Sequence, residues 1–212
     1  MQKNQTKLLD EVAMYYAGKL AEHGDTPRGV DWNGEESQII RFEQLCNVIH
    51  DGGASFRLND LGCGYGALLG YLHDHHPNAS YLGVDISSEM IQAATHRFNT
   101  SFDARFLVAA EPDELAHYGV ASGIFNVRLG RTDNEWFDYL EATLDVLDRT
   151  STMGFAFNCL TSYSDEDKKR DYLYYADPSK LFDLCKRRYS PQVALLHDYG
   201  LYEFTIVVRK VS

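Results

Sequence analysis

The chain has 212 residues, with 20 lysines or arginines against 31 aspartates or glutamates, so its formal net charge at pH 7 is −11. This length suits one α/β domain with a sizeable core. The negative charge disfavours nucleic acid as the main substrate, because contacts with phosphates require a stripe of basic side chains. The sequence has no long apolar run and no basic-then-apolar pattern at its N-terminus, so we expect a cytoplasmic protein that does not enter a membrane.

The first 52 residues are predicted to form a helical extension of the domain. Leu8 and Leu20 belong to the apolar face of a first amphipathic helix, which closes near Gly24. A glycine-containing loop leads to a second helix, which we expect to end at Gly52-Gly53. Residues 53–212 are predicted to complete the same domain, so the whole chain is one unit.

The most informative stretch is a glycine-rich turn after the first predicted strand, 55–61. Three glycines follow that strand at alternate positions, Gly62, Gly64 and Gly66, and a helical pattern begins at once. Glycine is needed where the backbone takes positive φ or where a ligand lies against the main chain. Because the next helix offers free N–H groups at its start, the turn predicts a nucleotide-type site at the first strand of a doubly wound sheet.

Two classes of cofactor use such a turn. The pattern Gly62-x-Gly64-x-x-Ala67 fits the dinucleotide fingerprint, which is weak on its own. Asp60, two residues before the first glycine, favours a different cofactor. A carboxylate there suits a cationic ligand and is unfavourable beside a pyrophosphate.

A second acidic residue follows the next predicted strand, 80–85. Asp85 ends that strand 19 residues after Gly66, and Ser87 or Ser88 is placed to cap the helix that follows. A carboxylate about 20 residues past the glycines can accept hydrogen bonds from both ribose hydroxyls. The alternative role for Asp85 is that of a helix cap, and the two roles can coexist.

The rest of the chain continues the alternation of strands and helices. Further strands are predicted at about 104–109, 118–125, 152–160, 193–197 and 202–208, of which the last two form a hairpin. Thr132 and Glu135 form a capping box ahead of a long helix, and Asp177-Pro178 begins another. The four cysteines, Cys46, Cys63, Cys159 and Cys185, are widely spaced and read as reduced thiols.

The order acidic-x-Gly-x-Gly-x-Gly at Asp60 to Gly66 resembles motif I of the class I S-adenosylmethionine-dependent methyltransferases. The resemblance covers roughly residues 35–212. It implies a Rossmann-like α/β fold, with a seven-stranded sheet whose last strand is antiparallel. It also implies S-adenosyl-L-methionine as cofactor and S-adenosyl-L-homocysteine as product.

The resemblance assigns cofactor contacts to the motif positions of this chain. Asp60 would serve the methionine amino group and Asp85 the ribose, with Ile86 against the adenine. Either Glu111 or a main-chain carbonyl would take the adenine amine, because the third strand runs into Ala109-Ala110 without the usual acid. The full set of expected cofactor residues is Asp60, Gly62, Cys63, Gly64, Gly66, Asp85, Ile86, Met90, Ala110, Glu111 and Arg41.

Arg41 has two possible roles. It lies near the start of the second helix, on a segment that folds over the cofactor in similar enzymes, and its guanidinium could bind the methionine carboxylate. A surface salt bridge is the alternative. The sequence names no certain catalytic residue, since methyl transfer depends mainly on alignment. The candidates at carboxyl ends of later strands are Asn126, Asn158, His197 and Asp198.

Two segments outside the core are predicted to select the substrate. The first surrounds Trp32. The second is the tyrosine-rich stretch 161–177, where Tyr163, Tyr174 and Tyr175 are the candidate contacts, as a lid or pocket wall. A packed amphipathic helix over 165–174 is the alternative for this stretch. His73-Asp74-His75-His76 lies at a helix end away from the glycine turn, so we expect no metal site.

These patterns predict a methyltransferase that acts on an oxygen or nitrogen of a small molecule. Neither the Asn-Pro-Pro-Tyr type of motif nor a Pro-Cys pair follows the fourth strand, which disfavours nucleic-acid bases as acceptors. Two alternatives stay open at this point. One is an NAD(P)-type oxidoreductase, and the other is a non-catalytic partner protein that binds S-adenosylmethionine.

Overall fold

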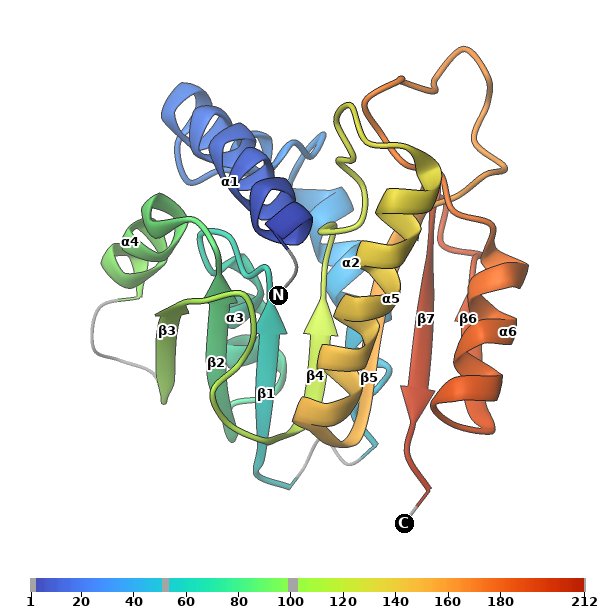
Figure 1. The fold of residues 1–212 in the computed structure, drawn as a ribbon. Helices are drawn as coiled ribbons and strands as arrows, with labels where there is room; N and C mark the ends of the chain where they lie inside the picture. The colour runs from blue at the N-terminus through green and yellow to red at the C-terminus, as the bar shows by residue number, and fades with distance from the viewer. Residues whose placement is uncertain (1–2, 51–53, 99–102, 212) are drawn as a thin grey trace.

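The computed structural model describes residues 3–50, 54–98 and 103–211, which alternate strands with helices (Figure 1). The strands are β1 (Phe56–Leu61), β2 (Ala79–Asp85), β3 (Ala104–Val108), β4 (Ala116–Ala121), β5 (Ser151–Leu160), β6 (Gln192–Leu196) and β7 (Glu203–Arg209). The helices are α1 (Lys3–His23), the 3-10 helix η1 (Pro27–Val30), α2 (Glu35–Cys46), α3 (Ala67–His75), α4 (Ser88–Arg97), α5 (Asp133–Thr150) and α6 (Pro178–Arg188).

The strands form one mixed sheet in the order β3-β2-β1-β4-β5-β7-β6. The first five strands are parallel, while β7 runs antiparallel to both β5 and β6. This confirms the predicted seven-stranded sheet with an antiparallel last strand. The parallel strands all end at one edge, the upper edge in Figure 1, where α1 and the loop after β5 lie. Ligands of open α/β sheets bind at such an edge.

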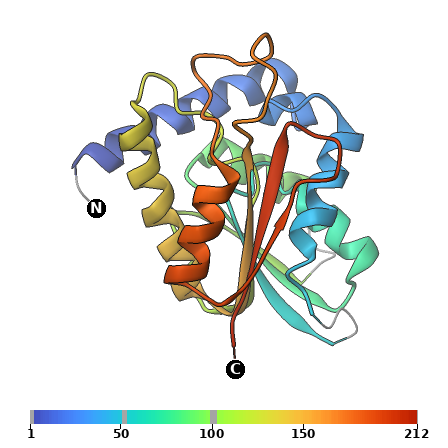
Figure 2. The ribbon, with the colours of Figure 1, turned by 90° about the vertical axis from the view of Figure 1, so that its right-hand side faces the viewer.

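Helices cover both faces of the sheet (Figures 1 and 2). On one face, α5 and α6 bury a cluster that includes Leu144, Phe155 and Phe157. On the other, α2, α3 and α4 pack over a second cluster that includes Leu45 and Leu58. With apolar side chains on both faces, the central strands are almost fully buried, which holds the upper edge rigid. Every helix in the described ranges is too short or too polar to span a bilayer.

Three predicted elements differ from the structure. β4 ends at Ala121 instead of residue 125, because Gly123 turns the chain with φ +75°. α2 ends at Cys46, where the N–H of Asn47 closes the last turn, and the predicted end at Gly52-Gly53 lies outside the described residues. The alternative helix over 165–174 is wrong, since this stretch is a loop of turns.

The predicted cap of α5 is confirmed. The hydroxyl of Thr132 accepts from the N–H of Glu135 at 3.3 Å, and the Glu135 carboxylate accepts from the N–H of Thr132 at 3.0 Å. Replacing Thr132 by alanine removes the side-chain acceptor at the helix start. We expect Thr132→Ala to lower the free energy of unfolding by about 1 kcal/mol, measured by urea denaturation. Thr132→Ser keeps the hydroxyl and serves as control; equal losses in both variants would contradict the capping role.

Candidate active site

The glycine turn after β1 adopts a backbone that other residues rarely take. Gly62, Gly64 and Gly66 have φ values of +76°, +53° and +79°. A Cβ on Gly62 would lie 2.1 Å from Cγ2 of Ile124, so that position also lacks space for a side chain. The N–H groups of Gly62 and Cys63 both donate to the carbonyl of Val84, at 2.7 and 3.0 Å. The turn is therefore fixed to the end of β2.

Asp85 joins the glycine turn to the helix that follows β2. One carboxylate oxygen accepts from the N–H of Gly64 at 2.9 Å, and the other accepts from the N–H of Ser87 at 2.8 Å. Burial raises the pKa of this carboxyl, while the hydrogen bonds from Ser87 and Gly64 oppose the rise. Ser87 itself caps α4, because its side chain accepts from the N–H of Met90. Asp85 thus stabilises the turn through these hydrogen bonds and also lines a cavity.

Asp60 is almost completely buried beneath the turn. The residue is 2 % exposed, and its carboxylate accepts a hydrogen bond from the Tyr81 hydroxyl at 2.6 Å. Burial raises the pKa of Asp60 to about 7; the Tyr81 hydrogen bond lowers it and the Asp85 charge raises it. A buried acid whose pKa lies near neutrality is typical of a functional site.

A cavity of about 120 Å³, here called the glycine-turn cavity, opens beside the turn. The ends of β1, β2 and β3 line it, as do the loop after β4, α5 and α1. Asp60 and Cys63 line a smaller hollow that shares Gly62, Gly64 and Ser122 with this cavity. The Ser122 hydroxyl is buried and has no hydrogen-bond partner in the described structure, so it is available to a ligand.

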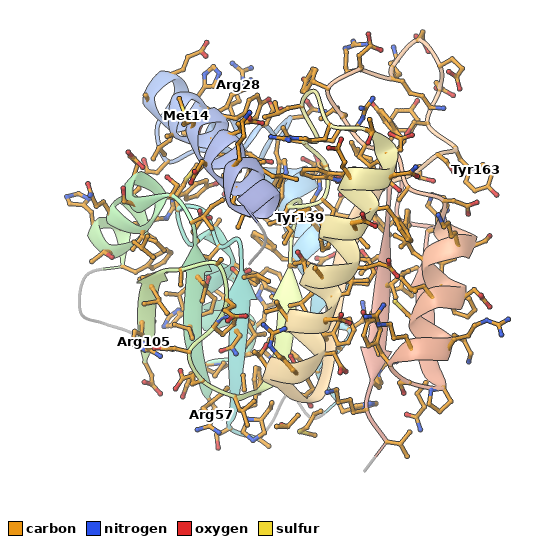
Figure 3. All side chains as sticks on the ribbon, in the orientation of Figure 1. Met14, Arg28, Arg57, Arg105, Tyr139 and Tyr163 are labelled. Carbon is orange, nitrogen blue, oxygen red and sulfur yellow. The ribbon has the colours of Figure 1, made fainter. Side chains whose placement is uncertain are left out.

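A second and larger cavity, here called the tyrosine cavity, lies on the other side of Trp32. Its volume is about 500 Å³, and its tyrosines are Tyr16, Tyr172, Tyr175 and Tyr202. Tyr16, Val30 and Trp32 line both cavities, so they form a shared wall. Tyr16 comes from α1, which crosses above the sheet edge in Figure 1 and packs near Tyr139 of α5 (Figure 3).

A buried ion pair closes the floor of the tyrosine cavity. The Nε and Nη2 atoms of Arg41 donate to the two carboxylate oxygens of Glu203 at 2.8 and 2.7 Å. The amide of Asn158 donates to the same carboxylate at 2.9 Å and accepts from the N–H of Gly123 at 2.7 Å. The guanidinium also lies 4.6 Å from the centre of the Trp32 ring. This network connects α2, β7, β5 and the loop after β4.

Most of the expected cofactor residues meet at the glycine-turn cavity. Its lining includes Gly62, Gly64, Asp85, Ile86, Met90, Ala110 and Glu111. Glu111 also forms an exposed ion pair with Arg149. Asp60 and Cys63 line the smaller hollow beside it, and two further expected residues lie elsewhere. Gly66 is the N-cap of α3 and packs toward Phe106, and Arg41 lines the tyrosine cavity through the buried pair described above.

The catalytic candidates separate into buried and exposed groups. Asn126 lines the tyrosine cavity, and its side-chain oxygen accepts from the N–H of Leu160 at 3.1 Å. Asn158 is fully buried in the ion-pair network. His197 and Asp198 are exposed and line neither cavity. The His197 ring instead packs against Tyr163.

The substrate candidates also divide. Trp32 and Tyr175 line the tyrosine cavity. Tyr163 is 72 % exposed and points away from the sheet (Figure 3). Tyr174 packs against the core clusters, and its N–H donates to the carbonyl of Asn126 at 2.8 Å.

Sequence reasoning missed three residues of this site. They are Tyr16 of the first predicted helix, Ser122 near the end of the fourth predicted strand, and Glu203 in the last one. An acid in an otherwise apolar strand is a signal that could have identified Glu203, because a buried carboxylate requires a partner.

Comparisons with known proteins agree with this geometry. A family described as "Methyltransferase domain" matches residues 59–150. The Mycobacterium tuberculosis protein named "Putative methyltransferase Rv1506c" is 63% identical over 157 residues, which are 74% of this chain and 95% of that protein. The chain belongs to the class I S-adenosylmethionine-dependent methyltransferase family. This membership favours the transferase interpretation over the oxidoreductase alternative.

Solved structures share the fold at low sequence identity. The N-methyltransferase NodS of Bradyrhizobium japonicum, in complex with S-adenosylhomocysteine, matches with a TM-score of 0.66 and 15% identity over 94% of this chain and 98% of that one. Magnesium protoporphyrin IX methyltransferase of Synechocystis, also with bound S-adenosylhomocysteine, matches with a TM-score of 0.65 and 12% identity, over 99% and 100% of the two chains. These matches confirm the Rossmann-like methyltransferase fold.

The Arg41–Glu203 pair yields a prediction about stability. Removing one charge leaves the other buried without compensation, which is strongly destabilising. We expect Arg41→Gln and Glu203→Gln each to lower the free energy of unfolding by about 3 kcal/mol. The double variant should lose clearly less than the sum, because no unpaired charge is left. Urea denaturation of the four proteins measures this coupling, and additive losses would contradict it.

Proposed function

We propose that this methyltransferase holds S-adenosylmethionine at the glycine-turn cavity and transfers its methyl group to an oxygen or nitrogen of a small molecule in the tyrosine cavity. The observation that carries the proposal is the shared wall of Tyr16, Val30 and Trp32 between the two cavities. A reaction between two ligands requires sites that meet, and these two sites meet at that wall.

The residues of the glycine-turn cavity fit the cofactor. Asp85 in this cavity and Asp60 in the adjoining hollow supply negative charge for an ammonium and acceptors for ribose hydroxyls. The buried Ser122 hydroxyl supplies a polar group that has no partner among the described residues. Ile86 and Met90 offer apolar contacts, and Glu111 or the main chain at Ala110 lies where an adenine amine could be bound. Arg41 is left out of this assignment, because its guanidinium is already bonded to Glu203.

When bound, S-adenosylmethionine supplies a methyl group on a sulfonium that is a good leaving group. The protein's own part is then to align the acceptor and exclude water. Burial, followed by the charges of Asp31 and Asp85, raises the pKa of Tyr16, so its hydroxyl stays protonated and acts as a hydrogen-bond donor at the shared wall. His197 and Asp198 are not assigned as a base, since neither lines a cavity.

A small acceptor in the cytoplasm is favoured over nucleic acid. The chain carries a net charge of −11, which opposes binding to a polyphosphate. The volume of the tyrosine cavity, about 500 Å³, lies in the range of pockets that enclose small molecules. Turnover on a metabolite panel separates this proposal from a partner protein that binds the cofactor without catalysis.

Calorimetry with the purified protein tests the cofactor assignment. We expect S-adenosylmethionine and S-adenosylhomocysteine to bind and NAD not to bind. Asp85→Ala removes charge-assisted hydrogen bonds worth roughly 1.5–3 kcal/mol each, so affinity should fall at least about tenfold. The unliganded variant should also melt somewhat earlier, because the bonds to Gly64 and Ser87 are lost. Unchanged affinity in the folded variant, or binding of NAD alone, would contradict the assignment.

The raised pKa of Asp60 predicts a pH dependence of binding. The unfolded carboxyl titrates near 3.8 and the folded one near 7, so in this window the folded protein holds a proton that the unfolded chain releases. The contribution of Asp60 to stability therefore falls as pH rises through the window. The charged carboxylate of Asp60, which would bind an ammonium, forms at the upper end of this pH window.

We expect the affinity for S-adenosylhomocysteine to increase from about pH 6 to about pH 8 in the native protein. In Asp60→Asn, which cannot ionise, the affinity should be lower and nearly independent of pH over the same range. Calorimetric titrations at several pH values measure both profiles. A native profile as flat as that of the variant would show that Asp60 does not ionise to bind the ligand.

A further inference from the structure

We propose that the acceptor in the tyrosine cavity is a small molecule with a flat apolar body and an anionic group, a carboxylate or a phosphate. This inference rests on the proposed function, because it names the class of acceptor for that same cavity. The inference follows from the charged side chains of the cavity wall. Some of them are already paired with an opposite charge, and others are not.

Both carboxylates of the cavity wall are already engaged by cations. Glu203 accepts two bonds from Arg41 and one from Asn158, all between 2.7 and 2.9 Å. Asp31 lies 2.9 Å from the Lys19 ammonium and accepts from the Tyr15 hydroxyl at 2.7 Å. A cationic acceptor would have to displace one of these partners. The wall therefore does not favour an amine that binds through its charge.

The two remaining cations of the wall lack comparable partners. Nη1 of Arg170 donates to the main-chain carbonyls of Asp167 and Lys169 at 3.2 and 3.0 Å, and no carboxylate in the described structure pairs with this guanidinium. Lys168 lies 3.2 Å from the carboxylate of Asp167, but both side chains are more than half exposed. Such an exposed pair contributes little.

Two cations of the loop after β5, Lys168 and Arg170, line the tyrosine cavity. The other charged residues of the loop do not line it: Asp165, Glu166, Asp167, Lys169 and Asp171. Because the two lining carboxylates are engaged by other partners, the lining of the cavity carries an excess of positive charge in a protein whose net charge is −11. That local excess is the opposite of the average surface, and it matches an anion.

The rest of the wall is aromatic. Trp32, Tyr172, Tyr175 and Tyr202 present rings with hydroxyl or N–H edges, a combination that suits a flat, partly polar ligand. The Tyr175 hydroxyl accepts from the main-chain N–H of Arg170 at 2.9 Å, so this ring is held to the backbone of the residue that carries one of the two cations. The aromatic surface and that cation therefore come from the same part of the loop.

The experiment uses protein saturated with S-adenosylhomocysteine and three probes of one shape: 4-hydroxybenzoate, 4-hydroxyphenyl phosphate and 4-hydroxybenzamide. We expect at least one anionic probe to bind about tenfold or more tightly than the amide, as measured by calorimetry. The comparison of benzoate with phosphate distinguishes the two kinds of anion.

Two variants assign the effect to the loop. Lys168→Gln with Arg170→Gln removes the two cations from exposed positions, so the fold should be retained, and the preference for the anion should fall to about threefold or less. Arg187→Gln is the matched control, because Arg187 is 78% exposed on α6, pairs with Asp183 and lines neither cavity. It removes a charge of the same sign from outside the site and should keep the full preference.

The outcomes separate this inference from the proposed function. Failure of S-adenosylhomocysteine to bind would overturn the proposed function. If S-adenosylhomocysteine binds normally, two results overturn only the present inference. One is that the amide binds as tightly as the anions, and the other is that no anion binds at about 10 mM. A preference that survives in the double variant, or that is lost equally in Arg187→Gln, also overturns it.

Discussion

The buried ion pair between Arg41 and Glu203 connects α2 with β7 across 162 residues of sequence. The pair belongs to a closed ring of contacts: Trp32 stacks on Arg41, Arg41 bonds to Glu203, Asn158 joins Glu203 to Gly123, and Gly123 packs against the Trp32 ring. The ring includes the wall between the two cavities. Its electrostatic strength comes from exclusion of water, so the wall position depends on the burial of α2 against β7.

The local signals of the proposed cofactor site could be predicted from the sequence. Asp60, the glycines and Asp85 lie within one strand–turn–helix unit and its neighbour, where chain order alone decides what is adjacent. Such a turn needs positive φ, which glycine adopts readily, and all three glycines of the turn have positive φ in the structure. The alternation of strands and helices could be predicted from their spacing, and the seven-stranded sheet from the resemblance to the methyltransferase family.

The contacts that define the tyrosine cavity could not be predicted in this way. Arg41 and Glu203 are 162 residues apart, and only the folded sheet makes them neighbours. Tyr16 faces the cavities because α1 crosses the sheet edge, a placement that its amphipathic pattern does not specify. The loop after β5 has the charges of an exposed helix, yet bridges from Thr161 to Ala176 and from Val127 to Leu173 hold it as a loop. Tertiary contacts there override local propensity.

The position of Trp32 has a further consequence for spectroscopy. The chain contains two tryptophans, and the other, Trp136, is fully buried, with its indole N–H bonded to the carbonyl of Phe125. Trp136 therefore contributes a constant background emission. Trp32 borders both cavities and lies beside a guanidinium, so its emission should respond when either ligand changes its polarity or its stacking. The protein thus contains an internal optical reporter for the interface between its two sites.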